Sequence, residues 1–201
     1  GYIRDALKEK EVEIEKGDLT DTVNAVRASM EEVLPGPMAG MRWIELEVAK
    51  VIKKGATQLE WVTPSGFVVV QKLNKKQTER LTLKLLGTVK INVATKDSDE
   101  VDLLHHKSAT SPNLIHSLDS SLLHLATLRF DAPIALIHDS VLCRATDMSS
   151  LSEIVRETYM KIFAEDSYIE SWAQQIGAET KPPIIGDLRP ESVTESTYFF
   201  C

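Results

Sequence analysis

The chain has 201 residues, of which 43% are hydrophobic and 26% charged, and its formal net charge is −7. This length suffices for one globular domain with a sizeable core or for two small ones, and no run approaches the ~20 apolar residues of a membrane span. The first residues are too charged for a secretory signal peptide. Two cysteines, Cys143 and Cys201, provide neither a disulfide framework nor a four-cysteine zinc site, which predicts a reducing compartment.

Two helices are predicted in the first quarter of the chain. Residues 19–34 carry valine and methionine side chains at helical spacing, and the tripeptide PGP that follows ends or sharply bends this helix. A second apolar stripe runs from Met41 to Ile52, and Gly55 closes that helix.

Strands are predicted next, between residues 57 and 96. The tetrapeptide TPSG (63–66) is typical of a turn, and β-branched residues follow it. In RLTLKLLGTVKINV (80–93), polar and apolar residues alternate as they do on the two faces of a strand. The polar stretch NKKQTE (74–79) and the acidic stretch KDSDEVD (96–102) are expected to be loops. The segment is therefore interpreted as one long, basic, two-stranded projection.

Charge within this projection is unevenly distributed. Six basic residues and one acid lie between Lys72 and Lys90, so this segment carries +5 and the remainder of the chain carries −12. A positive stripe on an acidic body is compatible with phosphate contacts confined to one place. The alternative is a solvated hairpin whose lysines protect exposed strand edges.

Two short polar signatures, HSLD and HDS, bracket the next unit. Pro112 and Asn113 mark an entry turn, and Ser117 or Asp119 can cap a helix that continues to Leu128. The runs APIALI (132–137) and SVLCRA (140–145) are then predicted as two buried antiparallel strands, with His138 and Asp139 at the tight turn between them. A further helix is expected over 151–163, capped near Asp147 or Ser149, before a turn-rich tail.

A carboxylate at such a turn is costly near a core unless a cation or several donors compensate it. Mg²⁺ prefers oxygen ligands and takes one or two carboxylates from a protein, so one aspartate supplies half a site. The HDS tripeptide alone is a weak signal, because such residues commonly form simple turns.

Several separated blocks, in one order, resemble the single-subunit, bacteriophage-type DNA-dependent RNA polymerases, a family that includes the mitochondrial enzyme. WVTPSGFVVVQ and RLTLKLLG are similar to the family's specificity-loop hairpin, and DSDEVD with SPNLIHSLDSS to its next block. IHDS resembles palm motif C, and YFFC resembles the aromatic C-terminal tail. The resemblance implies an α+β, mainly helical fold, the C-terminal part of a right-hand polymerase with a palm β-hairpin and a protruding basic β-hairpin.

The resemblance also implies catalytic roles. Asp139 matches the motif C aspartate, which ligates two catalytic Mg²⁺ ions together with an aspartate of motif A. His138 shapes the turn beside it, or is simply a structural histidine. His116 matches a histidine near the ribose of the nucleotide and the minor groove of the nascent pair; the alternative is a buried histidine at a helix start.

Nucleic-acid contacts are implied for the basic hairpin. Arg80, Thr82, Lys90 and Asn92 align with the positions that read the promoter, where side chains of this kind reach base edges in a major groove. Thr82 is shorter than the amide expected there, which predicts that the promoter preference is altered or lost. Cys201 replaces the small aliphatic end of the phage enzymes.

The resemblance divides the chain into a helical fingers portion (1–56), a specificity-loop-like insert (57–96) and a palm portion with motif C and the tail (97–201). The motif A aspartate and the motif B lysine and tyrosine lie upstream of everything seen here, and Asp97, Asp99 and Asp102 are interpreted as solvated. The chain is therefore expected to be a fragment or a split subunit, inactive without a partner chain that supplies motifs A and B.

The predicted function is DNA-directed RNA synthesis by two-metal nucleotidyl transfer. The partners are the DNA template and promoter, nascent RNA and nucleoside triphosphates, with no membrane. The predicted location is the cytoplasm of a phage-infected cell, with the mitochondrial matrix as the alternative. A non-catalytic DNA-binding or assembly subunit and a family A DNA polymerase fragment are the other readings; the latter usually carries His-Asp-Glu in motif C and lacks the PNLIHSLDSS block.

Overall fold

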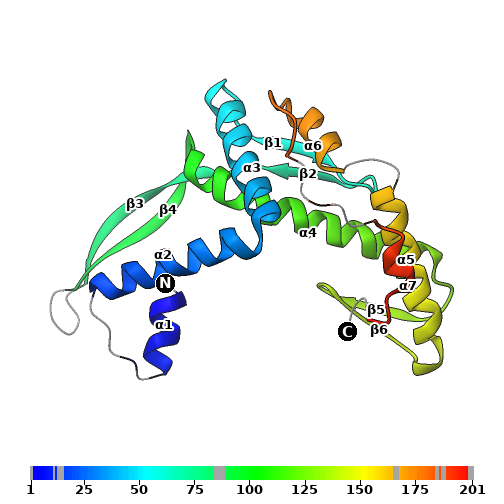
Figure 1. The fold of residues 1–201 in the computed structure, drawn as a ribbon. Helices are drawn as coiled ribbons and strands as arrows, with labels where there is room; N and C mark the ends of the chain where they lie inside the picture. Colours follow the sequence, from blue (N-terminus) through cyan, green and yellow to red (C-terminus); the bar gives the residue numbers. More distant parts are fainter. Residues whose placement is uncertain are drawn as a thin grey trace. The chain divides into compact units, whose positions relative to one another are not determined.

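The computed structural model describes residues 2–10, 12, 16–83, 89–164, 168–183, 186 and 189–198. Helices and three separate two-stranded antiparallel hairpins make up the described part of the chain (Figure 1). It divides into two compact units, one of residues 1–42 with 183–186 and one of 43–182 with 187–201. None of the described helices is long and apolar enough to cross a membrane.

The first unit is helical. Helix α1 spans Tyr2–Glu9, α2 spans Lys16–Val33, and α3 begins at Pro35 and continues into the second unit, to Lys53. The break between α2 and α3 falls at the predicted PGP sequence, and proline at the first helical position suits α3 because its missing N–H has no helical partner there. Three apolar side chains in the second half of α2 are exposed: Val26, Met30 and Val33.

The larger core of the second unit forms where α3 meets hairpin β1–β2 and helix α6. Strands β1 (Leu59–Val62) and β2 (Val68–Gln71) pair across the TPSG turn, and α6 spans Tyr168–Ile176. Trp43 and Trp172 meet edge to face at 6.0 Å, a favourable aromatic geometry. Trp61 is buried beside them. Helix α6 was not predicted from the sequence; burial of Trp172 and Ile176 fixes it.

Helix α4 spans Leu103–Arg129 and is the longest element in the described part of the chain (Figure 1). The predicted start after Pro112 is wrong, and neither Ser117 nor Asp119 caps it. Asp102 is the N-cap: its carboxylate accepts a hydrogen bond from the backbone N–H of His105 at 2.9 Å. Pro112 lies inside the helix, so α4 lacks one backbone donor there and still continues.

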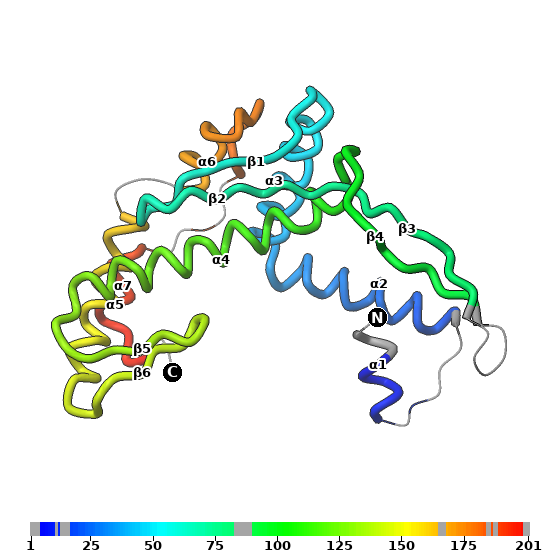
Figure 2. The backbone as a smooth tube through the Cα atoms, turned by 180° about the vertical axis from the view of Figure 1, so that it is seen from behind, coloured from blue at the N-terminus to red at the C-terminus, as the bar shows by residue number. Residues whose placement is uncertain are grey.

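Hairpin β1–β2 lies along α4, as two opposite views show (Figures 1 and 2). Trp61 Nε1 donates to Ser117 Oγ at 3.2 Å, and Ser65 Oγ donates to Ser121 Oγ at the same distance. At the other end of the hairpin, Gln71 bonds to Thr110. These contacts fix the middle of α4 against the larger core.

Strands β3 (Asn74–Leu83) and β4 (Val89–Val101) form one long ribbon. The expectation that NKKQTE and KDSDEVD are loops is wrong, because 74–79 lies in β3 and 96–101 lies in β4. The predicted single projection is therefore two hairpins, β1–β2 and β3–β4. Both faces of β3–β4 are mostly exposed. Polar residues therefore occur on both faces, and the sequence lacks the alternation of polar and apolar residues that marks a strand with one buried face.

A second, smaller core joins the end of α4 to β5 (Ile134–Ile137), β6 (Ser140–Cys143) and helix α5 (Met148–Ala164), which follows the 3₁₀ turn η1 (Ala145–Asp147). The predicted hairpin is confirmed, but its strands are not buried in this chain. One apolar face packs on α4 and α5, while Ile137 and Leu142 on the other face are more than half exposed.

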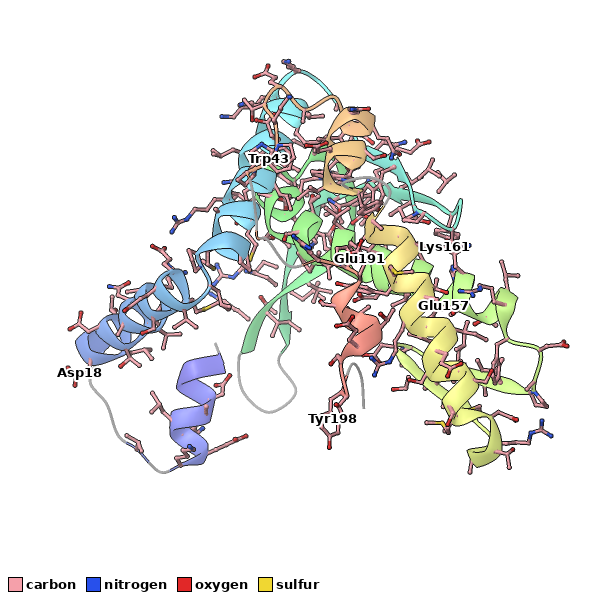
Figure 3. All side chains as sticks on the ribbon, turned by 45° about the vertical axis from the view of Figure 1, so that its right-hand side comes forward. Asp18, Trp43, Glu157, Lys161, Glu191 and Tyr198 are labelled. Carbon is pink, nitrogen blue, oxygen red and sulfur yellow. The ribbon has the colours of Figure 1, made fainter. Side chains whose placement is uncertain are left out.

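The tail returns along α5. Helix α7 spans Ser192–Glu195, and the guanidinium of Arg156 donates to the carbonyl oxygens of Val193 and Ser196. Figure 3 shows the Tyr198 side chain extending away from α7, and it is 90% exposed. The remaining three residues of the predicted aromatic tail, which include Cys201, lie outside the described residues.

Candidate active site and nucleic-acid interface

Helix α4 and hairpin β5–β6 bring the two polar signatures together. A cleft of about 440 Å³ is lined by His116, Asp119, Ser120 and Leu123 of α4 and by His138 and Asp139 of the hairpin turn. His116 is exposed and lies in the middle of α4, so the alternative of a buried histidine at a helix start is wrong. The cleft holds both predicted catalytic residues.

The hairpin turn is tight. Ile137 pairs with Ser140, leaving His138 and Asp139 as the only two turn residues. His138 has φ 56°, whereas Asp139 does not have a positive φ. A left-handed backbone costs a non-glycine residue about 1–2 kcal/mol, so the turn keeps a side chain at a position that favours glycine. This conformation presents the Asp139 carboxylate to the cleft.

Asp139 is exposed, and the expectation of a carboxylate held against the core is wrong for this chain. The hydroxyl of Ser140 lies 3.5 Å from Oδ1 of Asp139, a long distance for a hydrogen bond. The carboxylate oxygens of Asp139 therefore face the cleft with capacity to accept a cation or further donors. Among the residues that the structure describes, no group of three or more acidic, histidine or cysteine side chains is arranged to hold a metal.

Asp119 is a cleft residue that the sequence reasoning assigned only to helix capping. It follows His116 by three positions, so both side chains lie on one face of α4. Burial, and then the negative charge of Asp139, raise the pKa of Asp119, while His116 opposes this change. The i, i+3 spacing of His116 and Asp119 was the sequence signal that could have identified it.

The second group of predicted residues lies on one face of β3–β4. Arg80 pairs with Asn92 and Thr82 pairs with Lys90, so the four residues occupy two alternate cross-strand pairs, on either side of the pair Leu81–Ile91. Directly opposed residues share a face, and alternate residues on one strand do too. All four are exposed. The structure therefore gathers Arg80, Thr82, Lys90 and Asn92 into one polar surface patch, here called the hairpin face.

The basic stripe is partly neutralised at the hairpin's base. Lys75 forms an ion pair with Glu100, and Lys76 lies opposite Asp97 across the strands. The carboxylate of Asp102 accepts a hydrogen bond at the N-terminus of α4. Farther along the ribbon, Arg80 and Lys90 face no acid across the strands, and nor does Lys96, which pairs with Gln77. Lys84 lies outside the described residues.

Comparison with known proteins gives one consistent family. A family model described as DNA-dependent RNA polymerase matches residues 2–197. The chain is 31% identical to the DNA-directed RNA polymerase of Pseudomonas phage phiKMV over 98% of its own length and 25% of that protein's. It is 32% identical to the DNA-directed RNA polymerase 2, chloroplastic/mitochondrial, of Arabidopsis thaliana (86% of this chain, 17% of that protein). It is 30% identical to the DNA-directed RNA polymerase of Enterobacteria phage K11, over 75% of this chain and 18% of that protein. The chain thus spans a quarter or less of these relatives' lengths.

Proposed function

The chain belongs to the DNA-dependent RNA polymerase family, and from this membership we propose that it forms the part of a DNA-directed RNA polymerase that carries one metal-binding aspartate of a two-metal site. The observation that carries the proposal is the shared cleft of His116 and Asp139. The regions are assigned as fingers (1–56), specificity hairpin (57–96, with β4 continuing to Val101) and palm (97–201).

Asp139 fits the metal chemistry of this reaction. Its exposed carboxylate is a hard oxygen donor at the rim of an open cleft, and Mg²⁺ needs only one or two such donors from protein. The remaining ligands come from outside the described residues, from an upstream segment or a partner chain that carries motifs A and B. When held there by Asp139 and the other ligands, Mg²⁺ would supply Lewis-acid activation of the attacking hydroxyl and charge stabilisation of the leaving group.

The reaction joins an RNA 3′-hydroxyl to the α-phosphorus of a nucleoside triphosphate. The 3′-hydroxyl gives up its proton to solvent as the new P–O bond forms, the bond from the α-phosphorus to the bridging oxygen breaks, and pyrophosphate leaves with that electron pair. The Asp139 carboxylate would hold Mg²⁺ beside the reacting phosphate, where the positive charge of the ion would offset the negative charge of the phosphate oxygens. His116, on the facing helix, contacts the sugar of the incoming nucleotide, and His138 holds the turn in the conformation that presents Asp139.

The hairpin face provides promoter recognition in this proposal. A major groove admits a two-stranded ribbon. The two cross-strand pairs of the face are about 7 Å apart, because strand residues rise ~3.4 Å each, a spacing of about two base steps. Arg80 and Lys90 suit phosphates or guanine edges, and Asn92 suits adenine. The match to a phage enzyme supports a role in the cytoplasm of a phage-infected cell.

The decisive test is Asp139→Asn in the complete polymerase. The amide keeps the volume and one acceptor oxygen, so folding and DNA binding stay near the parent values, whereas phosphodiester formation loses on the order of 4 kcal/mol of transition-state stabilisation, or about a thousandfold in rate. The measurement is single-turnover extension of a primed template with ribonucleotides and, separately, deoxyribonucleotides. The matched control is Asp147→Asn, just beyond the hairpin and outside the cleft. A rate for Asp139→Asn within tenfold of the parent rejects the proposal.

A further inference from the structure

A buried histidine of helix α4 is hydrogen-bonded to the base of the β3–β4 hairpin. Leu73, just before β3, donates its backbone N–H to His106 Nε2 at 3.2 Å. The carbonyl oxygen of Leu73 accepts from the N–H of Asp102, 2.9 Å away, where β4 has ended and α4 begins. Both backbone groups of Leu73 are thus held by the start of α4.

His106 lies in a buried polar cluster. Its side chain is fully buried, and Nδ1 lies 3.2 Å from the side-chain amide of Gln71 at the end of β2. That amide also contacts Thr110 Oγ1 and the Asn113 side chain, both at 2.8 Å. The cluster therefore joins two successive turns of α4 to the point where the chain passes from β2 into β3.

The hydrogen bonds determine which nitrogen of His106 acts as an acceptor for the backbone. A neutral imidazole accepts at one nitrogen only, and Nε2 accepts from the N–H of Leu73. The Gln71 side chain is oriented by its other partners: its Nε2 donates to Thr110 Oγ1, and its Oε1 accepts from Asn113 Nδ2. Burial lowers the pKa of His106, with a smaller contribution from His105. Burial therefore favours the neutral ring, which can accept at Nε2.

We propose that His106 is a positioning residue that fixes the hairpin face relative to the helix that carries His116. The inference rests on the proposed function of the hairpin face. From Asn74 to Thr82 the strand rises through eight residue-to-residue steps, or about 27 Å at ~3.4 Å per step. A tilt of about 10° at the base moves the hairpin face by about 5 Å, more than the ~3.4 Å spacing of bases.

The first experiment measures position directly. Nitroxide labels on Glu79→Cys in β3 and Ile115→Cys in α4, both exposed sites, report the distance between hairpin and helix by pulsed electron resonance in the complete polymerase with its other cysteines replaced. His106→Leu removes the acceptor for Leu73, and we expect a distance distribution at least twice as broad as the parent's. His106→Gln places an oxygen near the position of Nε2 and restores the narrow distribution.

His105→Leu is the matched control, because His105 is the exposed neighbour on the same turn. If His106→Leu does not fold, His106→Asn replaces it, since its shorter amide reaches the position of Nδ1 but not that of Nε2. An unchanged distribution in the folded variant that lacks the Nε2 acceptor overturns the inference.

The second experiment separates this inference from the function on which it rests. With His106→Leu we expect promoter-dependent initiation to fall about tenfold and its start sites to spread, while extension of a preformed primer stays within twofold. A broadened distance distribution with unaltered initiation supports the role of His106 and rejects promoter reading by the hairpin face. Equal loss of initiation and extension, with an unchanged distribution, rejects the positioning role.

Discussion

Glu47 provides the sharpest test of how the larger core is held together. Its carboxylate is almost completely buried and accepts hydrogen bonds from Lys50 Nζ at 2.6 Å, from Thr180 Oγ1 at 2.7 Å and from the backbone N–H of Glu179 at 2.7 Å. Trp43 Nε1 donates to the same threonine hydroxyl at 2.9 Å. The cluster therefore ties α3 to the segment that follows α6.

The magnitude follows from the pKa of Glu47. Burial alone raises it, but the hydrogen bonds from Lys50, Thr180 and Glu179 outweigh burial and lower the pKa from 4.5 to about 2. A difference of this size corresponds to about 3 kcal/mol of preference for the ionised form in the folded chain. Because the folded pKa is the lower one, this stabilisation is fully present above pH 4.5 and is lost as the pH falls toward 2.

We expect Glu47→Gln to lower the free energy of unfolding at pH 7 by about 3 kcal/mol, since an amide cannot accept from all three donors. The difference from the parent should shrink steadily between pH 5 and pH 2. Urea unfolding followed by tryptophan fluorescence measures both quantities. Glu45→Gln is the control: Glu45 is 43% exposed and pairs loosely with Lys107 at 3.7 Å, so its loss should stay within about 0.5 kcal/mol. If Glu47→Gln lowers the free energy of unfolding by the same amount at pH 7 and pH 3, Glu47 is not held in its ionised form by this cluster.

Three further predictions follow from the two sites. Replacing both Arg80 and Lys90 with alanine should weaken promoter-dependent initiation and reduce its salt dependence by about one unit of slope per lost phosphate contact; equal loss of primer extension contradicts the DNA-contact role. His116→Ala should slow single-turnover extension less than Asp139→Asn does and reduce the preference for ribonucleotides, so an unchanged preference removes His116 from the sugar site. Asp102→Ala should destabilise the start of α4 by about 1 kcal/mol, measured by urea unfolding, and Asp102→Asn, which keeps an acceptor, should recover most of this loss.

Local chemistry in the sequence determined many of the elements. Apolar periodicity predicted α3 and α5, the PGP sequence located the break before α3, and apolar runs around a polar pair predicted hairpin β5–β6. These signals are local, because each depends on residues within one or two turns of each other. The separated blocks, quoted in chain order, also predicted the polymerase family that the comparisons confirm.

The tertiary structure decided the features that depend on distant partners. The acidic stretch in β4 pairs with the lysines of β3, which lie some twenty residues earlier in the chain. This pairing neutralises part of the positive charge at the base of the ribbon and leaves that of Arg80 and Lys90 unopposed across the strands. No pattern in NKKQTE reveals a strand, since its pairing partner lies far along the chain and neither face of the ribbon is fully buried.

The start of helix α4 was also decided by contacts with a distant part of the chain. Pro112 suggested a helix start, but the Asp102 cap and the burial of His106 and Thr110 against β2 extend the helix through the proline. That extension places His116 in mid-helix and Asp119 one turn further along the cleft. Packing against a strand from elsewhere in the sequence outweighs the local cost of a proline, and only the folded chain contains that packing.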